Sequence, residues 1–246
     1  MSKEKVVLEE KKPMMTAKEE ISNYTAKAQK ALTLFEDYTQ EQVDHIVHEM
    51  ALAAMEQHMP LANMAVEETG RGVYEDKCIK NMYAAENIWH SINKNKTVGI
   101  IEDNKVDQIM KVAAPVGVVA GIIPTTNPTS TTIFKAMICM KTRNPIIFSF
   151  HPSAEKCSAA TAKVVYDAAI KAGAPADCIQ WVEGVSMEKT AELINHPEVA
   201  VVLATGGAAM VKAAYSTGKP ALGVGPGNVP AYIEKTANIK RAVNDI

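Results

Sequence analysis

From Pro115 onward, short apolar runs rich in β-branched residues alternate with helical stretches, and this pattern constrains the fold most strongly. The helical stretches begin near Pro128, Ser153, Ser186 and Gly207. The apolar runs between them are VGVVAGII, PIIFSF, IQWV, VAVVLA and PALGV. Such runs, separated by helices, are typical of a parallel sheet covered on both faces. The sequence therefore predicts an α/β fold with a doubly wound parallel sheet, whose strand ends and helix N-termini meet at a ligand-binding edge.

Residues 16–93 are predicted to form a helical section before the sheet. Two capping boxes mark helix starts, because Thr16 is followed three residues later by Glu19, and Thr39 by Gln42. In the second helix, apolar residues recur at helical spacing and form one stripe: Val43, Ile46, Val47 and Met50. The helices of this section are therefore expected to be polar on one face.

Two more helices are expected before residue 93. Pro60 suits the first turn of a short helix, and Gly70 suits its end. A longer helix is expected to run from about Glu75 to Ser91.

The remaining segments complete the predicted organisation. Residues 1–15 are expected to be a mobile polar tail, since lysine and glutamate cluster there. Residues 97–113 contain two extended segments joined at Asp103–Asn104, which predicts a β-hairpin. The α/β sheet is expected over residues 115–246.

Composition excludes several classes of protein. The 246 residues include 26 Lys and Arg against 28 Asp and Glu, a net charge of -2, which argues against a dedicated nucleic-acid binder. No apolar run reaches about 18 residues, so no membrane span is predicted. The charged N-terminus lacks the apolar region of a secretory signal. We therefore expect a cytoplasmic protein with neither a membrane nor a nucleic-acid partner.

The four cysteines are far apart and form no C-x-x-C pair. This spacing indicates neither a zinc site nor a thioredoxin-like redox motif, and no metal site is expected. We expect free thiols that pack as small core residues. They are Cys78, Cys139, Cys157 and Cys178.

The turn after the VGVVAGII run is the first candidate site. Asn127 precedes Pro128, which disfavours a helical backbone at Asn127 and lets its side-chain amide point into a cleft. A rigid loop between a strand and a helix is where a doubly wound sheet binds nucleotides. An ordinary strand-to-helix turn with local caps explains these residues equally well.

Three further loops lie at predicted strand ends. His151 follows the PIIFSF run, although a lone histidine is more often structural than a ligand. The pair Gly206 and Gly207 opens a predicted helix, where free N–H groups suit a pyrophosphate. The segment 223–228 has three glycines but no G-x-G-x-x-G spacing, and residues 229–233 after it are expected to form a strand. No Walker loop, H-E-x-x-H or G-x-S-x-G motif is present. The residues alone predict a nucleotide-binding α/β domain and no specific reaction.

Several long motifs in order resemble the aldehyde dehydrogenase superfamily. They are PTTNPTSTTIFK, KTRNPIIF, HPSA, ATGGAAMVKAAY and GKPALGVGPGNVP. Within this superfamily the chain is most similar to the coenzyme A-acylating branch, specifically the N-terminal part of bifunctional aldehyde–alcohol dehydrogenases. The resemblance covers the chain from about residue 20 to 246. It implies a Rossmann-like NAD-binding domain over residues 16–246, with NAD as the cofactor.

The resemblance also implies roles for particular residues. Asn127 would donate its amide to the oxyanion of a thiohemiacetal. Gly206 and Gly207 would face the cofactor pyrophosphate, Gly225 the nicotinamide, and His151 the adenosine ribose. The nicotinamide–ribose side would be lined by the turn residues Ile122, Ile123, Pro124, Thr125 and Thr126. The hairpin at 97–113 resembles the family's oligomerisation strands, and a homo-oligomer or filament is expected for the full-length protein.

Two departures from the wider family bear on the reaction. Hydrolytic members have Glu-Leu-Gly-Gly where this chain has Gly-Val-Gly-Pro at 223–226, so the base that activates water is missing. This favours transfer of the acyl group to a thiol. The family's nucleophilic cysteine is expected beyond Ile246, and neither Cys139 nor Cys157 aligns with it.

The resemblance implies the NAD-binding half of an acylating acetaldehyde dehydrogenase. Its partners would be a small aldehyde and a coenzyme A thioester, and the chain alone is expected to be inactive. The alternative is a non-catalytic NAD-binding or self-assembly module.

Overall fold

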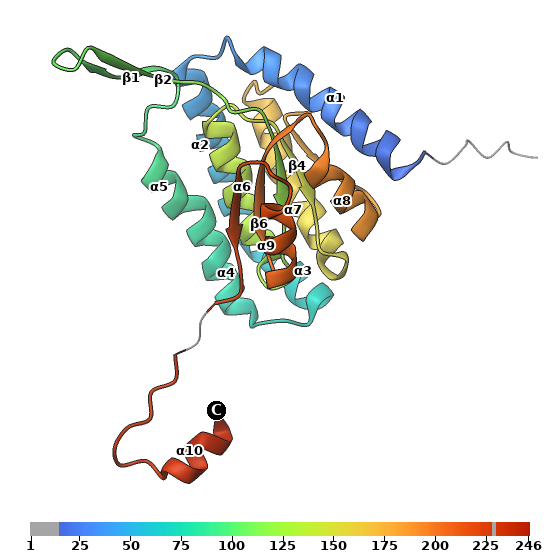
Figure 1. The fold of residues 1–246 in the computed structure, drawn as a ribbon, viewed down its shortest axis with the longest axis vertical. Helices are drawn as coiled ribbons and strands as arrows, with labels where there is room; N and C mark the ends of the chain where they lie inside the picture. Colours follow the sequence, from blue (N-terminus) through green and yellow to red (C-terminus); the bar gives the residue numbers. More distant parts are fainter. Residues whose placement is uncertain (1–14, 228–229) are drawn as a thin grey trace, which may run out of the picture.

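The computed structural model describes residues 15–227 and 230–246, and Figure 1 shows their arrangement. The expected tail, residues 1–15, lies outside the described residues except for Met15.

Five parallel strands form the central sheet, in the order β5-β4-β3-β6-β7. From β3 in the middle, the chain winds outward to β4 and β5 on one side and then to β6 and β7 on the other. The strands are Val118–Ile122 (β3), Ile146–Ser149 (β4), Ile179–Trp181 (β5), Val199–Thr205 (β6) and Ala221–Val224 (β7). Each coincides with one of the apolar runs, and the predicted doubly wound α/β fold is confirmed.

Helices cover both faces of the sheet (Figure 1). Successive side chains of a strand point to opposite faces. Val118 and Ala120 accordingly pack among residues of α1, α8 and α9, while Val119 packs toward α6 and α7. These helices are Ala17–Phe35 (α1), Pro128–Lys141 (α6), Glu155–Lys171 (α7), Met187–Asn195 (α8) and Ala208–Tyr215 (α9).

The N-terminal helices follow the local signals in the sequence. Both capping boxes are present, at Thr16 and at Thr39, and the stripe predicted for the second helix is buried. The helix expected to begin at Pro60 begins at His58, because a proline fits anywhere in a first helical turn; Gly70 ends it with a φ of 61°. The elements here are Gln40–Glu56 (α2), His58–Thr69 (α3), Tyr74–Met82 (α4), the π-helical turn Tyr83–Asn87 (η1) and Ile88–Ile92 (α5).

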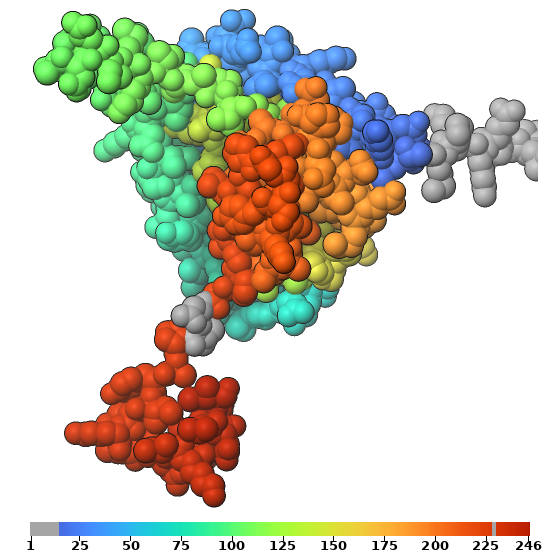
Figure 2. Space-filling model, viewed as in Figure 1, coloured from blue at the N-terminus to red at the C-terminus, as the bar shows by residue number. Residues whose placement is uncertain are grey.

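The hairpin projects from the body and is formed by β1 (Gly99–Asn104) and β2 (Ile109–Ala113) (Figures 1 and 2). The turn expected at Asp103–Asn104 lies instead at 105–108, since Asn104 is the last residue of β1. Its Oδ1 accepts the amide hydrogens of Val106 and Asp107, at 3.0 and 3.1 Å.

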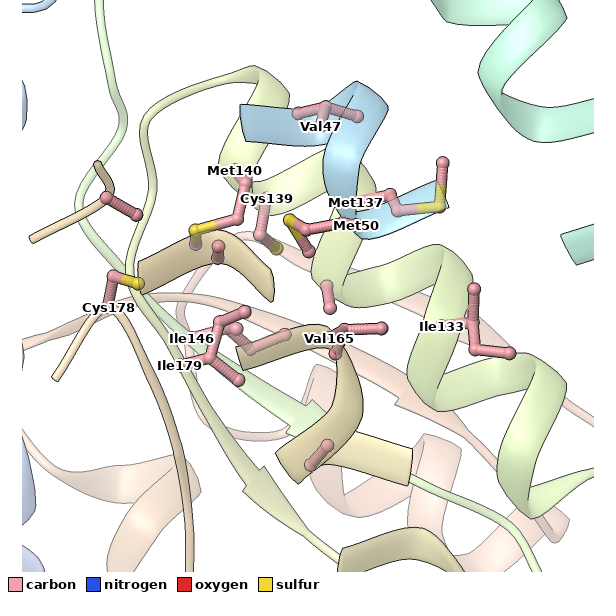
Figure 3. Close-up of a cluster of buried hydrophobic side chains, with 14 of the residues drawn as sticks. Val47, Met50, Ile133, Met137, Cys139, Met140, Ile146, Val165, Cys178 and Ile179 are labelled. Carbon is pink, nitrogen blue, oxygen red and sulfur yellow. The ribbon is translucent and has the colours of Figure 1, made fainter. Parts of the chain in front are cut away.

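The main core lies between the sheet, α2, α6 and α7, and consists mainly of alanine and isoleucine with methionine, valine and phenylalanine (Figure 3). Cys139 and Cys178 lie inside this cluster, and Cys157 is buried in a smaller cluster with Ala65 and Ala154. All four cysteines are free thiols. Three of them are thus core residues, while Cys78 is half-buried.

The segment after β7 differs from the expectation. Residues 230–233 form no strand, and 228–229 lie outside the described residues. Pro230 has no amide hydrogen for a neighbouring strand. The last helix, α10 (Ile239–Asp245), buries none of its residues and lies apart from the body in Figure 2. Among the described residues, no helix is long and apolar enough to cross a membrane, and no group of three or more His, Cys, Asp or Glu could hold a metal ion.

Candidate functional site

The sheet reverses its winding direction between β3 and β6, and a cavity of about 260 Å³ lies at the carboxyl ends of these strands. At such a switch point the loops of two neighbouring strands diverge and leave a crevice. Loops after β3, β4, β5 and β6 all contribute to its wall. Six of the residues singled out in the sequence line it: Ile122, Ile123, Pro124, His151, Gly206 and Gly207.

The strand ends beside the crevice are held together by Lys135, which sequence reasoning missed. This α6 lysine is only 2% exposed, and its Nζ donates to the carbonyl oxygens of Ile122 and Leu203, at 2.8 and 2.7 Å. It therefore ties the end of β3 to β6. Burial lowers the pKa of Lys135 to about 7, against a smaller opposing effect of Cys139. The pattern of an amphipathic helix gives no signal for this residue, since a lysine is ordinarily expected on the solvent face.

His151 lies exposed at the mouth of the cavity, just after β4. Its Nδ1 is 3.2 Å from the backbone nitrogen of Ser153, which donates to it, and 2.7 Å from the Ser153 hydroxyl. A ring nitrogen that accepts an N–H bond carries no hydrogen, so the neutral imidazole holds its hydrogen on Nε2. That Nε2–H is the group this histidine can offer to a ligand hydroxyl.

Gly206 and Gly207 connect β6 to α9 on the opposite wall. Gly207 is the N-cap of α9, with extended backbone (φ -68°, ψ 160°), and no atom lies within 4 Å of a Cβ built on it. The Gly206 amide donates to the carbonyl of Val224, at 3.1 Å. The helix therefore begins at an open surface where its positive end can attract an anion.

The other four candidates do not line the cavity. Thr125 contacts the Ser153 hydroxyl at 3.1 Å, and Thr126 is exposed. Gly225 follows β7, one residue beyond the Val224 carbonyl that anchors Gly206. Asn127 lines a different pocket.

That second pocket measures about 590 Å³ and is formed by α4, η1, α5 and α6. The exposed surface of its wall is mainly apolar, although several lining residues, Asn127 among them, carry polar groups. The lining residues are Ile79, Lys80, Tyr83, Ala84, Ile88, Asn127, Ser130, Thr131 and Phe134. The segment that joins β3 to α6 therefore contributes to both: Ile122–Pro124 at its start line the first cavity, and Asn127 at its end lines the second pocket.

Three of the four cysteines are in surroundings that oppose thiolate formation. Burial raises the pKa of Cys139, Cys157 and Cys178 to about 12. For Cys157 the nearby Glu68 carboxylate adds to this effect. A reactive cysteine needs the opposite, a lowered pKa and access to its substrate.

The model of the aldehyde dehydrogenase family matches residues 10–246. The chain belongs to this family. Among curated members, it is 60% identical over 94% of its length to aldehyde-alcohol dehydrogenase 2 of Entamoeba histolytica. It is 48% identical over 92% of its length to the bifunctional aldehyde-alcohol dehydrogenase of Escherichia coli. These matches cover 27% and 26% of the two relatives, in their N-terminal part.

Solved structures of aldehyde dehydrogenases share the fold. The acetylating aldehyde dehydrogenase of Geobacillus thermoglucosidasius is 52% identical with a TM-score of 0.86, over 93% of this chain and 50% of that one. The propionaldehyde dehydrogenase of Rhodopseudomonas palustris, 33% identical with a TM-score of 0.75 over 92% of this chain and 51% of that one, was solved with bound CoA and an acylated cysteine. An engineered glycolyl-CoA reductase, 33% identical with a TM-score of 0.76 over 92% and 51%, was solved with bound NADP+.

Proposed function

We propose that this chain is the NAD(H)-binding part of a CoA-acylating acetaldehyde dehydrogenase, which interconverts acetaldehyde, CoA and NAD with acetyl-CoA and NADH. The observation that carries the proposal is the cavity at the switch point between β3 and β6, with an open glycine N-cap on its wall. Similarity to aldehyde-alcohol dehydrogenases and to an acetylating enzyme supports the choice of reaction.

The cavity residues fit the parts of a dinucleotide. Gly207 leaves room for the pyrophosphate at the start of α9, and the helix dipole stabilises its negative charge. The Nε2–H of His151 suits a ribose hydroxyl. Ile122, Ile123 and Pro124 provide an apolar wall on the nicotinamide side. When bound, the nicotinamide would supply or accept the hydride.

Asn127 is proposed as the donor to the oxyanion that develops on the substrate carbonyl. Its side chain lines the pocket of about 590 Å³, which is large enough for a small aldehyde. A fixed N–H aimed at developing negative charge stabilises the transition state more than the ground state.

The lack of a carboxylate at Gly223 favours acyl transfer to a thiol over transfer to water, and the contacts around this glycine leave little room for a larger side chain. A Cβ at this position would lie 2.7 Å from Cγ1 of Val211 and 2.8 Å from Cε2 of Tyr215. The glutamate that hydrolytic members carry here would therefore clash with α9. Without that base nothing at this position activates water, and the acyl group is left for CoA.

The nucleophile of the proposed reaction is not among the four cysteines of this chain. Three are buried with raised pKa values, and the half-buried Cys78 lies on α4 outside the linings of both pockets. We therefore expect the 246-residue chain to bind the cofactor without turnover.

Titration of the chain with NADH, followed by cofactor fluorescence, tests the proposal. We expect saturable binding that Gly207→Val weakens by about tenfold or more, because the added side chain fills the space reserved for the pyrophosphate. The thermal midpoint should stay close to wild type, since the backbone of Gly207 is extended and its surroundings are open.

Ala213→Val is the matched control, because it adds bulk to the exposed, opposite end of the same helix. It should leave NADH affinity unchanged. Absence of saturable NADH and NADPH binding by the folded wild-type chain contradicts the proposed function.

A second candidate function is self-assembly. The hairpin exposes apolar side chains on both strands, including Ile100, Ile109 and Val112. Such a patch on a projecting hairpin favours association with another protein surface.

A further inference from the structure

The start of α6 has an asparagine that does not cap its helix. Asn127 is the N-cap residue, yet its side chain makes no capping hydrogen bond, and its backbone lies at φ -136° and ψ 61°. An N-cap asparagine ordinarily accepts an amide hydrogen of the first turn. The amide group of Asn127 is therefore held by something other than its own helix.

Helix α4 supplies that contact, together with two others to the same loop. Lys80 Nζ donates to Oδ1 of Asn127 at 3.1 Å, and Lys77 Nζ donates to the carbonyl oxygen of Thr126 at 2.9 Å. Residues 77, 80 and 81 follow the i, i+3, i+4 spacing, which places them on one helix face.

Asn81 completes the set from a fully buried position. Its Oδ1 accepts the hydroxyl of Thr129 at 2.7 Å, while its Nδ2 donates to the carbonyl of His58 at 2.9 Å. The loop that carries Asn127 is thereby fixed on both sides, at Thr126 and at Thr129.

The Lys80 contact decides which way the Asn127 amide faces. An ammonium group can only donate, so the amide oxygen must be the atom turned toward Lys80. The nitrogen Nδ2 then lies on the other side of the planar group. Among the described residues, its one hydrogen-bond acceptor is Thr126 Oγ1 at 3.5 Å, the outer limit of a hydrogen bond. The N–H groups of Nδ2 are left for a ligand.

The positive charge has a second consequence. A charged donor on the amide oxygen draws electron density from the nitrogen, which makes its N–H groups stronger donors. Lys80 is exposed, so this effect is reduced by solvent, whereas Lys77 is only 5% exposed and acts as the fixed anchor.

We propose that Lys80 is a positioning residue, which orients the Asn127 amide so that its Nδ2 donates to the substrate oxyanion, while Lys77 and Asn81 fix the loop backbone. This rests on the proposed function, in which Asn127 is the donor. Lys80 acts through Asn127 and needs no contact with the reacting atoms.

The side-chain NH₂ resonances of Asn127 in a ¹H–¹⁵N spectrum of the 246-residue chain test the orientation directly. The pair is assigned by its loss in Asn127→Asp. We expect Lys80→Met to shift this pair, because the hydrogen bond and charge on the amide oxygen are removed while the apolar stem remains. Lys80→Arg should keep it near the wild-type position, since the guanidinium still donates.

Lys163→Met is the matched control, because Lys163 is an exposed lysine that pairs with Asp167 on α7. It should leave the Asn127 pair unmoved. If Lys80→Met does not fold, Lys80→Leu removes both the charge and the hydrogen-bond donor and serves the same comparison. If the Asn127 resonances of the folded variant that lacks the Lys80 ammonium group are identical to those of wild type, the proposal is overturned.

A kinetic readout separates positioning from general stability. In an active enzyme that contains this chain, Lys80→Met is expected to lower kcat by about tenfold, with the KM for NADH unchanged, because only a transition-state contact is misplaced. Lys80→Arg should restore kcat. Unchanged kcat in Lys80→Met contradicts the role in catalysis, whereas a wild-type chain that fails to bind NADH contradicts the proposed function instead.

Discussion

Single buried lysines connect the strands and loops of this domain, and Lys135 connects β3 to β6. Its ammonium group donates to the carbonyls of Ile122 and Leu203, so two backbone acceptors at the ends of β3 and β6 are satisfied. An unsatisfied buried carbonyl is unfavourable by about 1–3 kcal/mol. Burial of the charge opposes this gain, which is why the pKa of Lys135 lies near 7.

Lys135 therefore predicts a pH dependence of stability. Below pH 7 the residue is protonated in both the folded and the unfolded chain, and the full desolvation penalty applies. Between pH 7 and 10.5 the folded state loses this proton while the unfolded state keeps it, so the free energy of unfolding rises with pH. From pH 7 to 9 we expect a rise of about 2 kcal/mol in wild type relative to Lys135→Met, measured by urea denaturation.

The difference between wild type and Lys135→Met also controls for the titration of the buried cysteines. The buried cysteines are present in both proteins, so their contribution above pH 8 largely cancels in the difference. Parallel curves for wild type and Lys135→Met between pH 7 and 9 would show that Lys135 stays charged in the folded state.

At the scale of elements, a helix N-terminus holds a loop that lines the cavity at the carboxyl ends of β3 and β6. Glu155 is the first residue of α7, and its Oε1 accepts the amide hydrogens of Gly184 at 2.7 Å and Val185 at 3.4 Å. Val185 lines the cavity. Because the carboxylate also lies at the positive end of the helix, it is stabilised there.

We expect Glu155→Ala to weaken NADH binding by about three- to tenfold, since a loop without this anchor must be ordered when the cofactor binds. Glu155→Gln should have a smaller effect because its amide oxygen still accepts the Gly184 hydrogen bond. Fluorescence titration measures both. Glu188→Ala removes an exposed carboxylate from the first turn of α8 and should not change the affinity. Equal affinities for Glu155→Ala and wild type would contradict the anchor.

Local signals explain which elements could be predicted from the sequence. Apolar runs, capping boxes and Gly70 act within a few residues, so strand positions and helix starts followed from them. The hairpin turn was misplaced by Asp103–Asn104, because the side chain of Asn104 stabilises the turn that follows it rather than forming its centre. The contacts of Lys80 and Lys135 join residues 47 and 68 positions apart, and no local pattern encodes them.

At the scale of the molecule, exposed apolar side chains lie on the projecting hairpin and on β7, the edge strand of the sheet, among other places. Ile100 and Val112 are cross-strand partners in the hairpin, 50% and 61% exposed. On β7, Leu222 and Val224 are 68% and 60% exposed. Two separate surfaces could therefore associate, and a test must distinguish them.

Sedimentation velocity of the 246-residue chain makes this distinction. We expect concentration-dependent association of wild type, and a shift to the 26.6 kDa monomer when Ile100→Lys is combined with Val112→Glu. Opposite charges on facing residues keep the two strands paired, so the hairpin should persist while its apolar contact is lost. The matched control combines Leu222→Lys with Val224→Glu on β7. Association that survives the hairpin pair and is lost in the β7 pair would move the interface to the edge of the sheet.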